Sequence, residues 1–199
     1  MKFIKISLIL LILFSGCSRN IPTLNERKAT ALSLVKNKNN FNLFSFQTNL
    51  EQCTNVNVYI EGDGLSWITR SRISSNPTPL NPIALKLMQV DNSKCKIYLA
   101  RPCQYVDSKI CEKKYWTSHR FNIKVIESYL ETLNKIKDTN NNKTFTLIGF
   151  SGGGAIATIL AAKRNDTSKL VTVAGNLDIK KWTETHNISP LNGSLNPNN

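Results

Sequence analysis

The chain has 199 residues, of which 41% are hydrophobic and 20% charged, and its formal net charge at pH 7 is +13. A chain of this length can bury most of the apolar surface of one domain. The charge raises the question of nucleic-acid binding, but the sequence contains no zinc-ligand spacing, no RNA-binding strand motif and no arginine-rich helix. We therefore do not expect nucleic acid as a partner, and we assign the charge to a lysine- and asparagine-rich surface.

Residues 1–16 predict an export signal. Lys2 and Lys5 precede an apolar run over residues 6–14, and two small residues close the segment. A basic start, a short apolar middle and small residues at the end are typical of a signal peptide. The run is too short to span a bilayer as a mature helix, which needs about 20 residues.

The five residues that end at Cys17 (Leu-Phe-Ser-Gly-Cys) resemble the bacterial lipobox, in which the cysteine is acylated and becomes the new N-terminus. Phe14 stands where that motif prefers leucine. We predict Cys17 as the lipid-attachment residue, and ordinary signal cleavage beside an unmodified cysteine is the alternative. Acyl chains would hold the protein on a membrane of the bacterial cell envelope, facing the periplasm or the exterior, without spanning that membrane.

Residues 17–40 predict a polar tether and an N-terminal helix, and residues 41–199 predict one domain in which strands and helices alternate. The expected strands cover residues 41–48, 55–60, 95–100, 144–148 and 170–174. The expected helices cover residues 81–90, 118–136 and 152–164, the second of them capped by Ser118. Because the connections are too long for hairpins, the pattern predicts an α/β fold, a three-layer αβα sandwich with a mostly parallel sheet.

Four further cysteines lie within the predicted domain: Cys53, Cys95, Cys103 and Cys111. An even number in an exported chain predicts disulfides, and four cysteines allow three pairings. We favour Cys103 with Cys111, which closes a short loop, and Cys53 with Cys95, each of which stands just before an expected strand. A cysteine-rich metal site is the alternative, but the sequence has no Cys-x-x-Cys pair and only two histidines, so we expect no metal.

The most informative segment is Gly-Phe-Ser-Gly-Gly at residues 149–153, between an expected strand and an expected helix. It has the G-x-S-x-G form of a nucleophile elbow, in which the serine backbone is strained and the flanking chain passes very close, so that glycine is needed on both sides. Such a turn exposes the hydroxyl near the positive end of the following helix. The motif therefore predicts Ser151 as a nucleophile.

A second loop, Glu-Gly-Asp-Gly at residues 61–64, follows the second expected strand. Reactive groups lie beyond the carboxyl ends of parallel strands, so this loop should lie near Ser151. A serine hydrolase stabilises its oxyanion with the N–H of the residue after the nucleophile and with one N–H from this earlier loop. The expected donors are Gly152 and Asp63, with Gly64 as the alternative to Asp63. Taken alone, the loop also fits a simple turn.

Together these motifs resemble the α/β-hydrolase superfamily, and more closely the bacterial lipoproteins of that fold. The shared motifs are E-G-D-G at 61–64, R-P-C-Q-Y at 101–105, W-T-x-x-R at 116–120, G-F-S-G-G-G at 149–154 and V-A-G-N-L-D at 173–178. The resemblance covers most of the chain after residue 50. It implies a Ser151 nucleophile in an Asp-His-Ser arrangement, a small-molecule ester or acyl substrate and no cofactor. Trp116 and Arg120 are expected to brace the long loop.

The histidine of that arrangement is not evident in the sequence. In the superfamily it follows the last strand, whereas little chain follows the expected strand at 170–174, so we expect an α/β-hydrolase domain without its last strands. Asp178 and His186 follow Ser151 in the expected order, and they are the candidate acid and base. His119 is instead expected near a helix start.

The leading prediction is a lipid-anchored serine hydrolase of the carboxylic-ester type, and the first alternative is a truncated relative without turnover. Residues 152–157 also match the G-x-G-x-x-A form of a dinucleotide-binding turn, with Asp178 downstream. Export argues against that alternative, because nicotinamide cofactors are cytosolic. A phosphate-binding P-loop is excluded, because Ala155 stands where its lysine would be.

Overall fold

A computed structural model describes residues 31–36, 41–106 and 109–199 of the protein. The predicted signal peptide at residues 1–16 and the predicted lipid-attachment residue Cys17 lie outside the described residues. Within the described part, no helix has the length and apolar character that crossing a membrane requires.

The fold is built on a six-stranded sheet with the strand order β1-β2-β4-β3-β5-β6. The strands are β1 (Ala31–Val35), β2 (Leu43–Gln47), β3 (Asn55–Ile60), β4 (Lys96–Leu99), β5 (Thr144–Phe150) and β6 (Thr167–Val173). Strands β4, β3, β5 and β6 are parallel to one another, whereas β2 runs antiparallel to both β1 and β4. The mostly parallel sheet that the sequence predicts is therefore confirmed.

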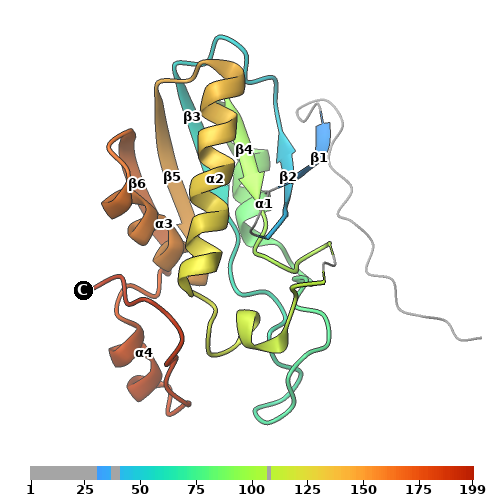
Figure 1. The fold of residues 1–199 in the computed structure, drawn as a ribbon, viewed down its shortest axis with the longest axis vertical. Helices are drawn as coiled ribbons and strands as arrows, with labels where there is room; N and C mark the ends of the chain where they lie inside the picture. Colours follow the sequence, from blue (N-terminus) through green and yellow to red (C-terminus); the bar gives the residue numbers. More distant parts are fainter. Residues whose placement is uncertain (1–30, 37–40, 107–108) are drawn as a thin grey trace, which may run out of the picture.

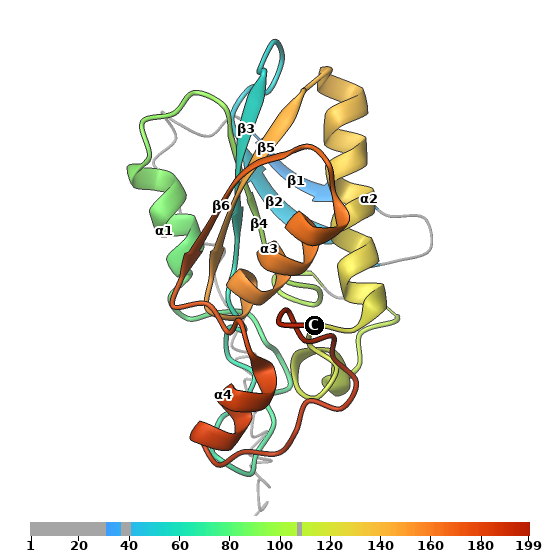
Figure 2. The same cartoon turned by 90° about the vertical axis from the view of Figure 1, so that its left-hand side faces the viewer.

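Helices cover both faces of this sheet. They are α1 (Ile83–Val90), α2 (Ile123–Asn140), α3 (Gly152–Lys163) and α4 (Ile179–Thr185), together with a short 3-10 helix, η1 (Lys113–Trp116). Figures 1 and 2 show α2 and α3 on one face of the sheet and α1 on the other, with α4 beyond the end of the strands. This arrangement is the three-layer αβα sandwich expected from the sequence.

Strand β3 shows how the sequence produces these layers. Its Val56, Val58 and Ile60 are fully buried in the core cluster that also holds the inner residues of α2 and α3. Its Tyr59 belongs to a second cluster, which forms under α1. Successive side chains of a strand point to opposite faces, so a central strand covered on both sides needs apolar residues in both registers.

Helix α2 buries one stripe of residues at helical spacing, and its start differs from the prediction. The buried hydrophobic residues of the stripe are Val125, Ile126, Tyr129, Leu133 and Ile136. The helix begins after Asn122, whose side-chain oxygen accepts a hydrogen bond from the backbone N–H of Lys124 at 3.1 Å. The predicted cap, Ser118, lies four residues earlier, and its hydroxyl is 2.8 Å from Nδ1 of His119.

Both favoured disulfides form. One joins Cys53 to Cys95, the residues that stand shortly before the parallel neighbours β3 and β4, with 5.9 Å between their Cα atoms. The other joins Cys103 to Cys111 and closes a short loop between β4 and η1. The first bridge ties together the starts of two neighbouring strands, and the second restrains the long connection that leads to η1.

Three elements differ from the expectations. Residues 31–35 form strand β1, paired with β2, where the sequence suggested a tether and helix over residues 17–40. The Leu-Ser-Leu alternation within this segment has the period of a strand, and pairing with β2 is a contact that local pattern does not reveal. Neither η1 nor α4 was expected, because one or two turns of helix are too short to show a clear apolar period.

The cap of α2 gives a first prediction. We expect Asn122→Ala to lower the free energy of unfolding by about 1 kcal/mol, because it removes a side-chain acceptor from the helix start. The side-chain amide of Asn122 also donates to the Gly193 carbonyl at 3.0 Å, so the loss includes that contact. Urea denaturation measures the difference, with Ser118→Ala as the control. An equal loss of stability in the two variants would show that Asn122 is not the cap of α2.

Candidate active site

Ser151 lies at the sharp turn between β5 and α3, with φ 51° and ψ −119°. A positive φ is uncommon for a residue with a side chain, and holding a residue in such a region costs on the order of 1–3 kcal/mol. The turn is held from both sides, since the Ser151 N–H donates to the Val173 carbonyl at 2.8 Å and the Ser151 carbonyl accepts from the Gly154 N–H at 2.9 Å. The structure thus places Ser151 on a strained strand-to-helix elbow.

Close approach explains the glycines of the elbow. A Cβ atom at Gly149 would lie 2.2 Å from the Gly153 carbonyl oxygen, and one at Gly153 would lie 2.3 Å from the Ile60 carbonyl oxygen. Both distances are far shorter than a real contact. The start of α3 therefore packs directly against the end of β3, and this packing brings Ser151 next to the loop that follows β3.

That loop and Ser151 share one cavity. The cavity has a volume of about 280 Å³, and it is lined by residues 61–65, residues 79–81, Phe150 and Ser151. Within the described part of the chain, neither the Asp63 N–H nor the Gly152 N–H donates a hydrogen bond to the protein. Asp63 therefore shares this cavity with Ser151, whereas Gly152 adjoins Ser151 in the chain and does not line the cavity.

The side chain of Asp63 is held by two arginines. Its Oδ1 is 2.8 Å from Nη1 of Arg101, and its Oδ2 is 2.7 Å from Nη1 of Arg120. Both guanidiniums also bind backbone carbonyls, Arg101 that of Arg120 and Arg120 that of Thr117 at 2.8 Å. The arginine side chains are only 5% and 6% exposed, so this is a buried ion cluster with an excess of one positive charge.

The cluster determines the charge state of Asp63. Burial alone would raise the pKa of its carboxyl, but the Arg120 and Arg101 guanidiniums outweigh this effect and hold the pKa below its ordinary value of 3.8. A carboxyl whose pKa is lowered by folding stabilises the folded state at pH values above its unfolded pKa. That contribution is lost as the pH falls toward the folded pKa.

The ion cluster also touches the elbow. A Cβ atom at Gly152 would lie 2.2 Å from Oδ1 of Asp63 and 2.9 Å from Nη1 of Arg101. A side chain at residue 152 would therefore displace the paired Asp63 and Arg101 side chains. The first residue of α3 packs directly against the ion cluster. Sequence analysis placed Arg101 and Arg120 in shared motifs, but it gave no signal that both bind Asp63.

Glu61 lies two residues before Asp63 in a different environment. Its carboxylate accepts hydrogen bonds from the Gly62 N–H at 2.8 Å, the Tyr98 hydroxyl at 3.2 Å and the Ala84 N–H in the first turn of α1 at 3.4 Å. Burial raises the pKa of this carboxyl, although its hydrogen bonds act in the opposite direction. The contacts of Glu61 anchor α1 to the loop, and Glu61 lines the same cavity as Ser151.

The structure does not bring Asp178 and His186 together. Asp178 caps the start of α4, where its side chain accepts from the Lys181 N–H at 3.0 Å, and His186 lies at the other end of that helix. Eight residues of helix span about 12 Å. The His186 ring lies 5.2 Å from the ring of Trp182, and it lines a different cavity from Ser151. The predicted acid and base do not form a triad in this arrangement.

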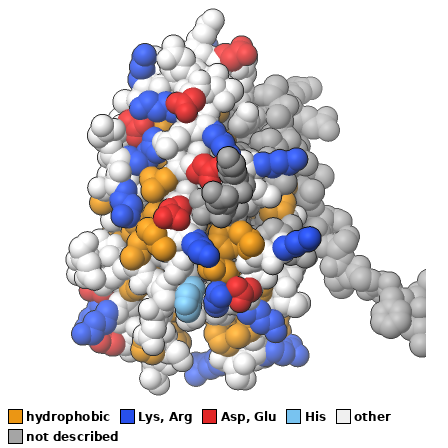
Figure 3. All heavy atoms as spheres, viewed as in Figure 1, with side chains coloured by type: hydrophobic (Ala, Val, Ile, Leu, Met, Phe, Trp, Pro, Cys, Tyr) orange, Lys and Arg blue, Asp and Glu red, His pale blue; other side chains and the backbone are white. Residues whose placement is uncertain are grey.

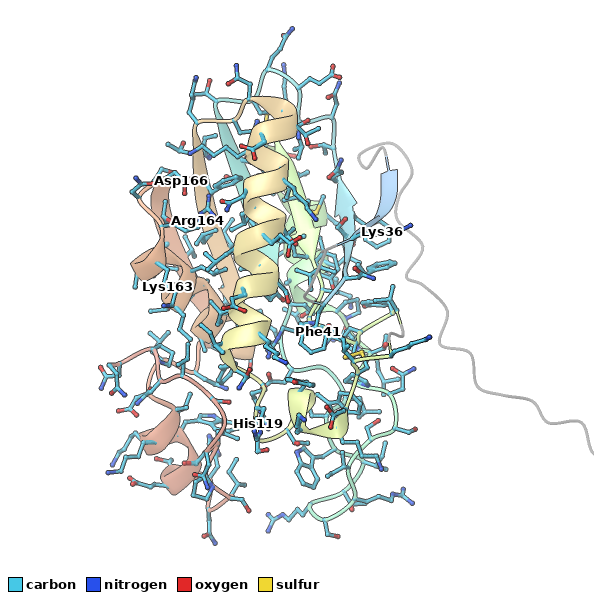
Figure 4. The ribbon with its side chains drawn as sticks, viewed as in Figure 1. Lys36, Phe41, His119, Lys163, Arg164 and Asp166 are labelled. Carbon is cyan, nitrogen blue, oxygen red and sulfur yellow. A yellow bond between two sulfur atoms is a disulfide. The ribbon has the colours of Figure 1, made fainter. Side chains whose placement is uncertain are left out.

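The other histidine is also engaged elsewhere. His119 lies between η1 and α2, as Figure 4 shows, with its Nδ1 2.8 Å from the Ser118 hydroxyl. A Cβ atom at Gly193 would meet its ring at 2.2 Å, so the C-terminal segment packs against it. Neither of the two histidines in the sequence lines the cavity of Ser151.

Two other expectations concern cofactors. The glycines of the dinucleotide-like motif pack against Ile60 and the Asp63 carboxylate, so a pyrophosphate at this turn would meet the protein's own backbone and an acidic group. Among the described residues, no group of three His, Cys, Asp or Glu side chains is arranged to hold a metal ion.

Basic side chains are spread widely over the face in Figure 3, as the net charge of +13 suggests.

Comparisons with known proteins support the fold. No protein-family model matches the chain, and neither does any curated protein. One similar solved structure is described as DcsB in complex with its substrate analogue, with a TM-score of 0.51, 11% identity, and coverage of 78% of this chain and 50% of that one. Another is a lipase-esterase related protein from Clostridium acetobutylicum ATCC 824, with a TM-score of 0.45, 18% identity, and coverage of 75% and 56%. The chain spans about half the length of either structure. The likeness to the first of them supports the α/β fold alone.

The ion cluster gives a second prediction. We expect Asp63→Asn to lower the free energy of unfolding by about 3 kcal/mol at pH 7, because two buried guanidiniums lose their counter-charge. As the pH falls, the wild-type protein loses the stabilisation that ionised Asp63 provides, whereas the variant has none to lose. The difference in stability between the wild type and Asp63→Asn should therefore shrink as the pH falls toward 2.

Urea denaturation at several pH values measures both effects. Glu112→Gln is the matched control, because it breaks an exposed ion pair with Lys114, and exposed pairs contribute little to stability. Equal losses in the two variants would show that the buried cluster does not restrain the fold.

Proposed function

We propose that the protein is a serine hydrolase that cleaves an ester or a related acyl bond, with Ser151 as its nucleophile. The observation that carries the proposal is the strained backbone of Ser151, a residue with a side chain at φ 51°, at the start of α3 and on the cavity formed with loop 61–65. Backbone strain of this kind is concentrated at functional sites. The α/β-hydrolase-like fold is a framework on which such an elbow operates.

The chemistry follows from the surroundings of Ser151. Its Oγ attacks a substrate carbonyl carbon, and the developing oxyanion accepts hydrogen bonds from the N–H groups of Gly152 and Asp63. The start of α3 and the net positive charge of the cluster of Asp63, Arg101 and Arg120 favour the same negative charge. The leaving group departs with a proton, and water then releases the acyl group from Ser151.

Transfer of the Ser151 proton requires a general base, and this requirement bears on a second candidate function. Neither histidine lines the cavity of Ser151, and Asp178 caps α4. A serine without a base is a weak nucleophile, and loss of one triad member costs orders of magnitude in rate. These observations favour, as the alternative, a protein that keeps the elbow and the cavity without turnover.

Fluorophosphonate labelling of the full chain decides between the two candidates. We expect the protein to be labelled, and we expect Ser151→Ala and Ser151→Gly to abolish the labelling. Glycine adopts a positive φ readily, so Ser151→Gly should also be more stable than Ser151→Ala, by about 1 kcal/mol. Thermal unfolding measures that difference.

Ser168→Ala is the control, because this serine lies on β6, where its hydroxyl bonds Asn55 and Phe145 rather than facing the cavity. Labelling that survives in Ser151→Ala would reject Ser151 as the nucleophile. A folded wild-type protein that is not labelled would reject the hydrolase and support the alternative.

We propose in addition that the protein is a lipoprotein of the bacterial cell envelope, anchored through acylated Cys17. The support is the basic and apolar segment before Cys17 and its Leu-Phe-Ser-Gly-Cys sequence. The two disulfides of the folded domain, Cys53–Cys95 and Cys103–Cys111, fit an oxidising compartment as well.

Cell fractionation tests the anchor. We expect Cys17→Ala to move the protein from the membrane fraction to the soluble fraction after export, because several buried acyl chains hold a protein firmly and their loss leaves no equivalent attachment. Cys111→Ala serves as a control that removes a cysteine without touching the lipobox. Unchanged retention of the Cys17→Ala protein on the membrane would reject the anchor.

A further inference from the structure

A second cavity, of about 680 Å³, lies at the same end of the molecule as α4. Its walls come from three segments far apart in the sequence: the loop after β3, the turn between η1 and α2, and α4 with the chain that follows it. The lining residues are Trp67 and Arg70; Thr117, Ser118 and Arg120; and Trp182 with residues 185–191. Figures 1 and 2 show α4 at this end of the molecule, beyond the strands. Ser151 does not line it, so this cavity is separate from the proposed active site.

The charge on the lining has one sign. Its charged groups are the guanidiniums of Arg70 and Arg120, and none of the described lining residues carries a carboxylate. Arg120 is 5% exposed, and it is held rigidly because its Nη1 binds Asp63 and its Nε binds the Thr117 carbonyl. Its Nη2 makes no hydrogen bond to the described part of the protein. A fixed guanidinium with an unused donor is suited to a carboxylate or a similar anion.

The same cavity has an apolar wall. The indoles of Trp67 and Trp182 line it, with the Arg120 guanidinium 5.8 Å from the Trp182 ring, and Ile188 and Leu191 extend the apolar surface. Trp67 is 39% exposed and Ile188 is 43% exposed, so large hydrophobic groups face solvent at this point. Small-molecule sites typically combine a volume of about 300–1,000 Å³, apolar walls and a few placed polar groups.

We propose that this cavity binds a small organic anion that has an apolar body, such as a medium-chain carboxylate. The anionic group pairs with Arg70 and Arg120, and the apolar body packs against Trp67 and Trp182. The proposal does not rest on hydrolysis at Ser151, since binding requires no reaction. Arg120 nevertheless joins the cavity to Asp63, which lines the cavity of Ser151.

Intrinsic fluorescence of the full chain tests the proposal, because two of its three tryptophans line the cavity. Titration with octanoate should give a saturable change, and titration with octan-1-ol, which lacks the charge, should not. Arg70→Gln should raise the dissociation constant for octanoate by about tenfold or more, as expected for loss of a charge-assisted hydrogen bond.

Arg72→Gln is the matched control, because Arg72 lies in the same loop, is exposed and does not line the cavity; its constant should stay within about twofold of wild type. Ser151→Ala should bind octanoate as wild type does, which separates this site from the proposed nucleophile. Absence of a saturable response, an equal response to octan-1-ol, or equal weakening in the two arginine variants would overturn the proposal.

Discussion

The buried pairing of Asp63 with Arg101 and Arg120 is the interaction on which the geometry of the candidate site depends. It joins the loop after β3, the segment that follows β4 and the turn before α2, and Gly152 packs directly against it. Desolvating charges is costly, so a buried ion cluster is weak evidence for net stability. Its effect here is geometric, because each guanidinium also binds a backbone carbonyl, and these bonds restrain the relative positions of the three segments.

Two acidic residues of one loop illustrate how environment sets charge. Glu61 is surrounded by neutral donors, the N–H groups of α1 and the Tyr98 hydroxyl, and burial raises the pKa of its carboxyl. Asp63 meets two fixed cations, and the pKa of its carboxyl is lowered despite burial. The loop therefore combines an acid whose charged form is disfavoured with a carboxylate whose charge is more than balanced by its two arginine partners.

Local signals account for what could be predicted from the sequence. The G-x-S-x-G segment predicts the sharp turn at Ser151, and the alternation of strands and helices predicts the three layers. The positions of the cysteines relative to two strands predict the disulfides that form. Asp63 and Arg120 are 57 residues apart, and nothing local marks them as partners. The separation of Asp178 and His186 by α4 was hidden for a similar reason, because a seven-residue helix is too short to show a clear period.

The Cys53–Cys95 bridge spans 42 residues, and the chain-entropy treatment assigns such a loop about 4 kcal/mol of stabilisation, a large share of the stability of an ordinary domain. In a reducing compartment the chain lacks this contribution, and its unfolded state is correspondingly more populated. For the export that we propose, the unfolded chain is the form that can cross a membrane, so a weaker fold before oxidation favours export. Oxidation after export would then form the bridge and stabilise the folded state.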